Sequence, residues 1–399
     1  MSEFKASGFR DEFGSGGPDL VGITTMTSPY YFVPPSGTTA ERPSDPPPGM
    51  LRFNTDIGRL EVWRNDHWGT ILGESLNLGD QNQTNSAGGT GTRGLFAGGY
   101  LVSPNPNGAC FNNVDAITVE TLGNSMDFNN LTNSLMGGGQ CADRTRALYA
   151  GGKGPTNSSG DNANISFCTI SSRGDYADSG FDLSASVSCR GTSNSTRGLF
   201  GSFIQPYADT IDYVTIQSLG NAQDFGNLTE VRGYGMAVSS PVRAVWAGGV
   251  YTPFNTGTNV IDYVTLSTTG DAQDFGDLTG NSGGAYESGN VNSSTRGVIA
   301  GGTRFNKNID FFTIATTGNS RNFGDLDTLT GPGKGSACST TRGVIAGGHP
   351  SPSTNIMEFI TIPTTGDAID FGDLQSFSRK IPQAGVSNGH GDSKYNYGE

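Results

Sequence analysis

The sequence predicts an all-β protein built from six repeats of about 50 residues each. The stretch TRGVIAGG occurs at Thr295–Gly302 and again at Thr341–Gly348, and four looser copies precede these two. Glycine accounts for 61 of the 399 residues, and charged residues for only 15%. That composition is typical of short strands joined by tight turns rather than of long helices.

Three motifs alternate in one order along the chain. The first contains an arginine: Arg93, Arg146, Arg197, Arg243, Arg296 and Arg342. The second is an apolar central stretch: VDAITV, ISFCTI, IDYVTI, IDYVTL, IDFFTI and MEFITI. The third resembles QDFGDL and contains Phe128, Phe181, Phe225, Phe275, Phe323 and Phe371. A catalytic motif is needed once, so this repetition indicates architecture.

Each repeat supplies four segments of strand length. They are a segment of small residues, the arginine segment that ends in Gly-Gly, the central stretch and the phenylalanine segment. No small-residue segment precedes Arg93, whereas a surplus one, residues 383–391, follows the last repeat. We expect this C-terminal segment to pair in the first repeat, because pairing of the two ends removes exposed sheet edges.

Four-stranded units with a Gly-Gly strand end resemble the kelch repeat of β-propellers. The resemblance implies a six-bladed kelch-like propeller over residues 92–391, with the C-terminal strand closing the first blade. Gly201-Ser202 breaks the double glycine in the third copy. The remaining chain divides into an N-terminal arm and hairpin (1–75), a Gly/Asn-rich linker (76–91) and a C-terminal tail (392–399).

The recurring arginines are interpreted as structural. Five central stretches carry an acid, which would lie on a strand next to the arginine strand and pair with an arginine within a blade or between blades, as Arg296 would with Asp310 or Asp262: Asp115, Asp212, Asp262, Asp310 and Glu358. Ser166 takes this position in the second repeat. The alternative is a ligand-binding ring of arginines. The phenylalanines are expected to pack between blades, where burial of each ring is worth about 2 kcal/mol or more.

Function is expected in the segments that differ between repeats. The loops after the Gly-Gly strands vary most, and we expect them to share one face with the connections between blades. Loops on a rigid scaffold are common binding sites. Aromatic rings beside Asn and Thr can stack on sugars and hydrogen-bond to them, so the candidate ligand-binding residues are Tyr100, Phe111, Tyr207, Tyr251, Phe254 and Phe305. The alternative is that these rings only hold the loops in place.

Several function classes are disfavoured. A net charge of −13 argues against nucleic-acid binding. The five cysteines form no CxxC pair and the chain has three histidines, so we expect no disulfide framework, metal or other cofactor. A sialidase-type SxDxGxTW box is absent, and we expect no enzyme activity. The charged start MSEFKASGFRDEF and the lack of long apolar runs predict a chain made in the cytoplasm, without a signal peptide or membrane insertion.

The N-terminal part predicts a small hairpin after a proline-rich arm. Apolar strands Leu51–Phe53 and Leu60–Trp63 flank the turn NTDIG, and Trp68 follows as a cap. A hairpin of this size is marginal alone, so we expect a partner or other copies of the chain to stabilise it. The candidate anchoring residues are Tyr30, Tyr31, Phe32, Leu51, Phe53, Leu60, Val62, Trp63 and Trp68.

The phrase PPGMLRFNTDIGRLEVW is similar to the N-terminal module of phage virion and tail-fibre proteins, particularly those of marine cyanobacterial phages. Repeats written as STRGxFAGG, IDYVTI and DFGDL occur in those proteins too. The resemblance implies a virion protein made in the host cytoplasm, anchored to other tail or capsid proteins by its N-terminus. It also implies a homo-oligomer, expected to be a trimer, whose propeller binds a host-surface glycan or other receptor. The alternative is a structural virion component, such as a capsid decoration, adaptor or baseplate protein, whose propeller contacts other phage proteins.

Overall fold

The computed structural model describes residues 34–56, 59–64, 66–70, 93–101, 109–154, 162–172, 174–185, 188–204, 206–251, 256–279, 288–302, 306–328, 331, 333–348, 355–374 and 385–388. These residues fall into two compact units, one within 1–74 and the other within 75–399. Almost all regular structure in them is β-strand. The predicted all-β class is confirmed.

The first unit contains one four-stranded sheet in the order β1-β2-β3-β4. Its elements are β1 (Ser36–Gly37), the 3-10 helix η1 (Thr39–Glu41), β2 (Leu51–Asn54), β3 (Arg59–Trp63) and β4 (Trp68–Thr70). Strands β2 and β3 pair antiparallel, with Leu51 opposite Val62 and Phe53 opposite Leu60. The predicted hairpin is therefore present, and β4 extends it through the pairing of Trp63 with Trp68.

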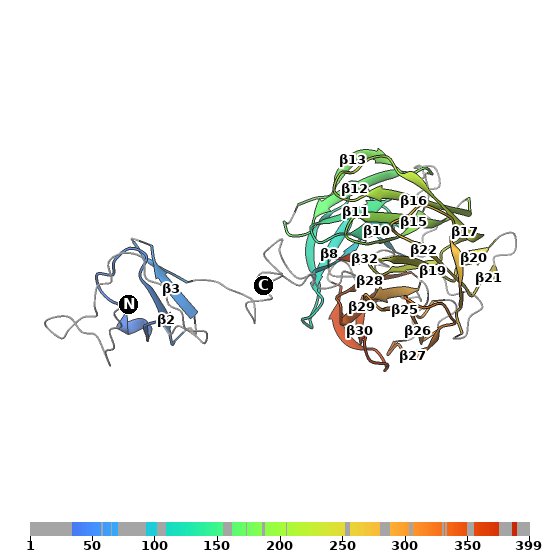
Figure 1. Cartoon of the computed structure of the whole chain (residues 1–399). Helices are drawn as coiled ribbons and strands as arrows, with labels where there is room; N and C mark the ends of the chain where they lie inside the picture. The colour runs from blue at the N-terminus through green and yellow to red at the C-terminus, as the bar shows by residue number, and fades with distance from the viewer. Residues whose placement is uncertain are drawn as a thin grey trace, which may run out of the picture. The chain divides into compact units, whose positions relative to one another are not determined.

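The described residues of the second unit form six main antiparallel sheets, one for each repeat (Figure 1). Sheet one is β32 (Gly385–Ser387), β5 (Arg93–Ala97), β8 (Asn113–Thr118) and β9 (Met126–Asn130). Sheet two is β10 (Gly139–Ala142), β11 (Arg146–Ala150), β12 (Asn164–Thr169) and β13 (Ala177–Asp182). Sheet three is β14 (Ser188–Ser193), β15 (Arg197–Ile204), β16 (Ala208–Thr215), β17 (Gln223–Gly233), β20 (Val250–Tyr251) and β21 (Thr256–Gly257).

The other three sheets repeat the four-stranded order. Sheet four is β18 (Met236–Ser239), β19 (Arg243–Ala247), β22 (Val260–Thr265) and β23 (Gln273–Asp277). Sheet five is β24 (Gly289–Asn292), β25 (Arg296–Ala300), β26 (Asn308–Thr313) and β27 (Arg321–Asp325). Sheet six is β28 (Lys334–Cys338), β29 (Arg342–Gly347), β30 (Ile356–Thr361) and β31 (Ile369–Asp373). A two-stranded ribbon of β6 (Tyr100–Leu101) and β7 (Ala109–Cys110) accompanies them.

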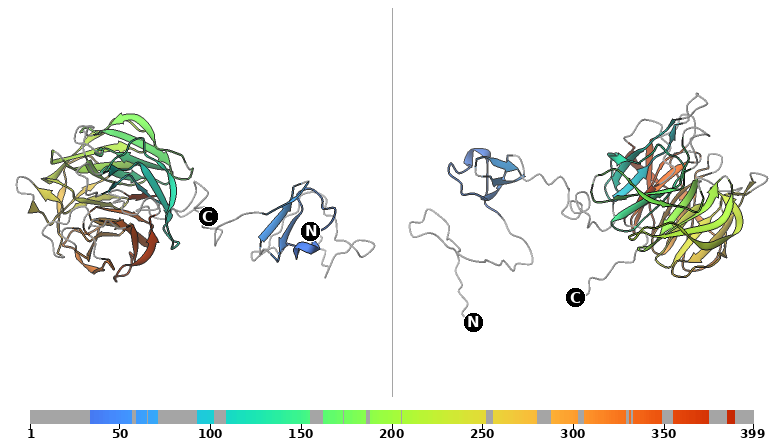
Figure 2. Two further views of the ribbon diagram at one scale, coloured as in Figure 1. Left: turned by 180° about the vertical axis from the view of Figure 1, so that it is seen from behind. Right: turned by 90° about the horizontal axis from the view of Figure 1, so that it is seen from above.

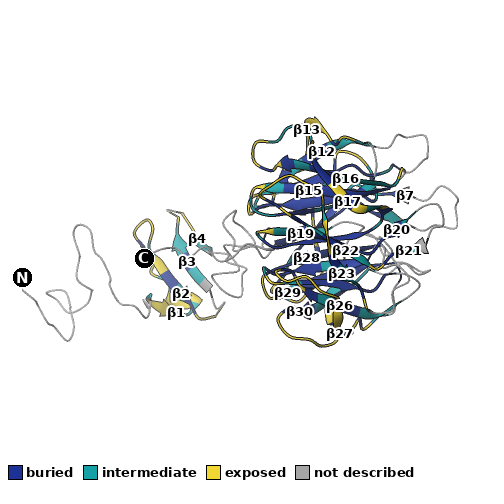
Figure 3. Cartoon of the chain, turned by 45° about the vertical axis from the view of Figure 1, so that its right-hand side comes forward, coloured by how far each residue is buried: buried dark blue, intermediate teal, exposed yellow. Residues whose placement is uncertain are grey.

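In five of the six repeats the arginine strand ends where the double glycine turns the chain. Gly301 and Gly302 have φ of 64° and 121°, a left-handed region in which residues with a Cβ are strained. The central strands are rich in Val, Ile and aromatic residues, which suit a packed sheet. They are buried on both faces near their middle, as in Val260–Thr265. Figure 3 shows this gradient, with burial greatest inside the unit and the outermost strands most exposed.

The innermost strands of successive sheets contact one another in the order β32, β10, β14, β18, β24, β28, and β28 contacts β32 again. Figures 1 and 2 show the sheets following one another around the unit, from green through yellow to red. The predicted pairing of the C-terminal segment is confirmed, because β32 pairs with β5 in the first sheet, with Val386 opposite Leu95.

Backbone bonds join each outer strand to the turn before the next outer strand. The Gly318 N–H donates to the Phe275 carbonyl at 2.7 Å, and the Ser320 N–H donates to Asp277 at 2.8 Å. The same pair of bonds links the last sheet to the first, where Gly123 donates to Phe371 and Ser125 donates to Asp373. The backbones approach so closely that a Cβ on Gly324 would lie 2.4 Å from the Gly366 carbonyl oxygen. The glycine of the phenylalanine motif is therefore required by contact between sheets.

The phenylalanines pack between sheets in five of the six repeats, where each ring is at most 5% exposed. The prediction is wrong for Phe181, which is 36% exposed. In sheet two the bulge between Ile165 and Ser166 passes over two residues, 179 and 180, whereas the bulge in sheet four passes over one, so Phe181 pairs directly with Ile165. In sheet four the equivalent Ile261 pairs with Gly276, so Phe181 takes the position of that glycine. Tyr176 is instead the buried aromatic residue beside this strand.

The arginines link neighbouring sheets, but not through the acids. Each guanidinium lies 4.4–5.7 Å from an aromatic ring of its own sheet. Each Nη1 donates, at 2.7–3.3 Å, to a carbonyl just beyond the central strand of the following sheet: Ile170, Ile216, Leu266, Ile314, Ile362 and, for Arg342 of the last sheet, Val119 of the first.

The predicted pairing of Arg296 with Asp262 or Asp310 is wrong. Arg296 lies opposite Thr313, and alternation places Phe311 on the same face and Asp310 on the other. Asp262 pairs instead with Arg232, at 2.9 Å. The other central acids with described partners bond to the segment after the preceding outer strand. Thus Asp212 accepts from the N–H and hydroxyl of Ser184, and Glu358 accepts from the Thr328 N–H.

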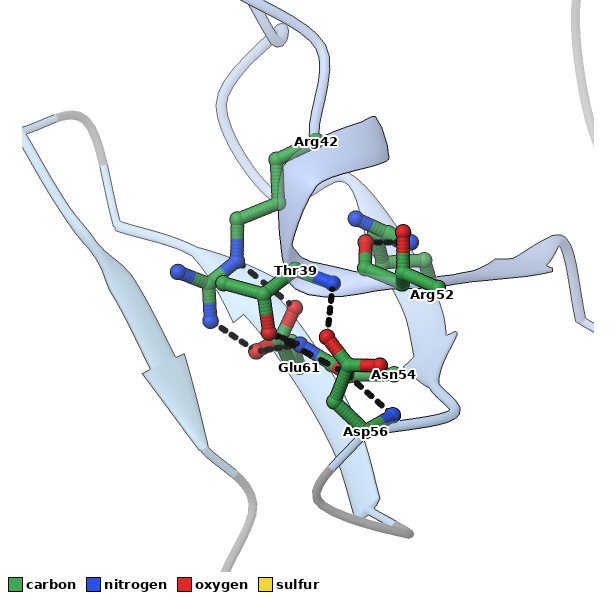
Figure 4. A network of polar contacts seen from close by, with 7 residues as sticks. Thr39, Arg42, Arg52, Asn54, Asp56 and Glu61 are labelled. Carbon is green, nitrogen blue, oxygen red and sulfur yellow. Dashed lines mark hydrogen bonds and ion pairs between the residues drawn. The ribbon is translucent and has the colours of Figure 1, made fainter.

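The proline-rich segment before the hairpin is not simply an extended arm in its described part. It forms β1 and η1 and packs on one face of the hairpin through a buried polar network (Figure 4). Glu61 is fully buried and accepts from Arg42 and from the Asn54 amide, the latter at 2.8 Å. The Arg42 hydrogen bond holds the pKa of Glu61 below its usual value. The sequence pattern of apolar residues did not reveal this network, because it is polar.

Candidate functional site

The variable loops and the connections between sheets lie on one side of the second unit. Strand β5 runs from Arg93 toward Gly98, and strands alternate in direction across an antiparallel sheet. The loop that follows Gly98 and the connection that follows β9 therefore leave from the same edge, and the same holds in every repeat. We call this side the loop face. Figure 3 shows β7, β20 and β21 together on it.

Two of the connections, after sheet one and after sheet three, are bonded to loops of both neighbouring repeats. In the connection after sheet one, the Leu135 N–H donates to Phe111 at 3.1 Å, and the Leu135 carbonyl accepts from Gly99 at 2.9 Å. The next residue, Met136, exchanges two backbone bonds with Lys153 of the second repeat. After sheet three, Arg232 pairs with Ala208 on one side and with Tyr251 on the other. The scaffold therefore holds the bases of these loops in fixed positions.

Four of the predicted loop aromatics are described, and all four are half-buried. Tyr100 lies in β6 opposite Cys110, and the Phe111 N–H donates to the Gly99 carbonyl at 3.0 Å. Tyr207 precedes β16, and Tyr251 ends β20. Phe254 and Phe305 lie outside the described residues. These positions support, in part, the interpretation that the aromatics hold the loops, because half of each side chain is packed.

The structure adds one aromatic that the sequence analysis missed. The ring of Tyr234 lies 6.1 Å from that of Tyr207, at 72°. Tyr234 belongs to GYGMAVSS (233–240), the small-residue segment of the fourth repeat, but β18 begins only at Met236. In the sequence, this position in a connection is indicated by the two glycines, Gly233 and Gly235, that flank Tyr234.

The centre of the second unit is too narrow for a small-molecule ligand. Residues of all six innermost strands, including Gln140, Asn290 and Ser387, line a cavity of about 30 Å³. That volume has room for a water molecule or two. Gln140 is 5% exposed, and its side-chain amide has no hydrogen-bond partner. Ordered water would satisfy it.

Three buried cysteines of the described chain do not supply a reactive thiolate. Burial raises the pKa of Cys168 and Cys189 to about 12, and that of Cys338 to about 11, so these thiols stay protonated at neutral pH. Among the described residues, no group of three or more His, Cys, Asp or Glu side chains is placed to hold a metal ion. No helix in the described part of the chain is long and apolar enough to cross a membrane.

The candidate anchoring residues lie on the two faces of the first sheet. Leu51, Phe53, Leu60 and Val62 share the face opposite Glu61; Leu51 is 38% exposed and the other three are half-buried. Trp63 and Trp68 lie on the Glu61 side with ring centres 5.6 Å apart. Tyr30, Tyr31 and Phe32 lie outside the described residues.

The chain matches no protein-family model and no curated protein sequence.

Proposed function

We propose that the second unit is a closed six-bladed β-propeller in which each sheet is a blade. Three series of contacts support this proposal, because each continues from the sixth sheet to the first. They are the innermost strands, the backbone bonds between outer strands, and the arginine bonds that end with Arg342 on Val119. The pairing of β32 with β5 places both ends of the unit in one blade.

We further propose that this propeller is a non-catalytic binding module on a phage virion. The binding role rests on one observation, which is that the recurring residues and the variable loops of each repeat have different roles. The recurring arginines, acids and glycines are used in contacts between sheets, whereas the loops vary in sequence and are tied at their bases. Such a scaffold can present different side chains without loss of stability. The ligand that suits half-exposed tyrosines is a saccharide of the host surface.

The first unit would attach the protein to other tail or capsid proteins. Its apolar residues Leu51, Phe53, Leu60 and Val62 lie on the sheet face that the buried Glu61 does not occupy. The resemblance of PPGMLRFNTDIGRLEVW to phage virion proteins supports this role. The fibre proteins that the chain resembles form trimers, and association of three copies would cover the same face.

A deletion experiment in the phage tests the proposal. Removal of residues 1–75 should abolish incorporation into particles, as judged by an antibody against the second unit. The isolated fragment 76–399 should still bind host cells. If the full-length protein is in particles but neither it nor the fragment binds cells, the protein is instead a structural virion component.

A further inference from the structure

The third repeat departs from the others on the loop face. Its strands β15 and β17 have 8 and 11 residues, whereas β19 and β23 of sheet four have 5 each. Its outer strand also pairs with β20, which comes from the following repeat. Sheet three is therefore the one main sheet with six strands among the described residues. The additional strands extend this sheet on the loop face.

Ser202 replaces the first glycine of the double-glycine motif and Phe203 the second, and the structure explains the serine. Its φ is 56°, although it carries a Cβ. The buried Ser202 hydroxyl accepts the Gly235 N–H at 2.8 Å, a bond that glycine cannot make. Tyr234, next to Gly235, also has a positive φ, of 63°. Strained backbone of this kind persists where surrounding structure enforces it, and it is concentrated at functional sites.

This turn brings two tyrosines together. A Cβ on Gly233 would lie 2.6 Å from Cδ1 of Tyr207, so Gly233 leaves the space that the Tyr207 ring fills. The Tyr207 and Tyr234 rings then meet edge to face. Val231 alternates with the buried Arg232 along β17, so it shares the strand face of Gly233. Val231 is 44% exposed, so an apolar side chain lies open to solvent on the strand face toward which the Tyr207 ring packs at Gly233.

We propose that Tyr207, Val231 and Tyr234 form the main saccharide-stacking subsite of the loop face. This inference rests on the proposed binding function and locates it in the third repeat. Aromatic rings next to an apolar side chain fit the C–H face of a hexose ring. The net charge of −13 disfavours sulfated or uronic-acid sugars through repulsion, so the ligand class is an uncharged hexose polymer. Ser202 is a positioning residue.

The full-length protein should be tested on an array of neutral glucans, mannans and galactans. Variants Tyr207→Ala, Tyr234→Ala and Val231→Ser should each lower the affinity for the bound polysaccharide about tenfold. Val231→Ser serves as the variant that keeps the fold, because this side chain is exposed. Tyr100→Ala, at another candidate ligand-binding residue of the loop face, is measured alongside these variants. The matched control is Ile369→Ser, which is 59% exposed on outer strand β31 and should change the affinity less than about threefold.

Ser202→Gly gives a separate readout of positioning. Glycine readily adopts the positive φ of this position, so the melting temperature should stay within a few degrees while the affinity for the polysaccharide falls. The saccharide site lies elsewhere if Tyr207→Ala, Tyr234→Ala and Val231→Ser all retain the affinity while Tyr100→Ala loses it. That result would overturn this inference but leave the proposed saccharide-binding function standing. If the wild-type protein bound none of the polysaccharides, both the inference and the saccharide-binding function would fail.

Discussion

The repeat arginine makes the same two contacts in all six sheets. Its flat guanidinium lies on an aromatic ring of its own sheet, and one N–H reaches a carbonyl of the next sheet. Lysine cannot reproduce this arrangement, because its ammonium is a point charge without a planar face or a fixed fork of donors. In sheet one the central strand has Ala116 where the others have an aromatic residue, and Arg93 lies over Phe128 of the outer strand instead.

Arg296→Ala should therefore destabilise the second unit by about 1–2 kcal/mol, through loss of the contact with Phe311 and the bond to Ile362. Arg296→Lys should recover only part of this loss. The measurement is chemical denaturation, and the control is Arg321→Ala at an exposed position of β27. An unchanged unfolding free energy in Arg296→Ala would refute the structural role of the arginines.

The carboxyl groups of the two units predict opposite responses to acid. Burial raises the pKa of Asp212, Asp262 and Glu358 in the second unit. Each of these groups holds its proton more firmly in the folded state, so its contribution to stability is present below its unfolded pKa and is lost as pH rises through the folded value. In the first unit, hydrogen bonds from Arg42 and Thr38 lower the pKa of Glu61 and Glu41. Their contribution is present above the unfolded pKa and is lost as pH falls.

As the pH falls toward about 4 and below, the first unit should thus lose stability while these buried acids favour the folded second unit. The tryptophans separate the signals, because Trp63 and Trp68 lie in the first unit and Trp246 is buried in the second. Asp212→Asn should flatten the pH dependence of the second unit, and Asp370→Asn, at an exposed position, should not. A slope unaffected by Asp212→Asn would contradict the assignment.

The pairing of arginine with acid could not be predicted correctly without the strand register. Both residue types recur in step, which made an ion pair the simplest interpretation. The register places Arg296 opposite Thr313, so alternation puts Asp310 on the opposite face. A residue-level pattern shows that two positions matter, but it does not show which face of the sheet each occupies.

At the level of elements, strand β32 completes the first sheet. Its Val386 is 5% exposed and packs in the same cluster as Leu95, and its Ser387 hydroxyl bonds to both backbone groups of Cys338 in sheet six. The strand thus joins the first sheet to the last.

Truncation after residue 384 should lower the unfolding free energy of the second unit by about 3 kcal/mol or more, because it removes a buried valine, three backbone pairs and a covered sheet edge. Truncation after residue 391 is the matched control and should have little effect. Equal melting temperatures for the two proteins would mean that β32 does not close the unit.

The type and order of the four main strands of each repeat could be predicted from the sequence, because the periodic motifs are local and repeat six times. The exceptions arose where one repeat departs from the rest. In the third repeat, Ser202 and the extended β17 build the turn at Tyr234, and no repeated pattern marks it. In the first unit, Glu61 lies in an apolar strand as a buried acid, and only its contact with Arg42 from the proline-rich segment explains it.

At the level of the whole molecule, the chain combines a large repeat-based unit with a small one. The core of the second unit is distributed over clusters between neighbouring sheets, as expected for an array stabilised by nearest neighbours. The first unit depends on a polar network and leaves apolar side chains partly exposed. This contrast is what a stable binding module and an attachment module would require.

Competition for adsorption tests the central claim most directly. Purified full-length protein is mixed with phage particles and host cells, and unadsorbed particles are counted. We expect the wild-type protein to lower particle adsorption in proportion to its concentration. The doubly substituted Tyr207→Ala/Tyr234→Ala protein should compete at least about tenfold less well at an unchanged melting temperature. Adsorption unaffected by the wild-type protein would contradict the claim that the loop face binds the host surface.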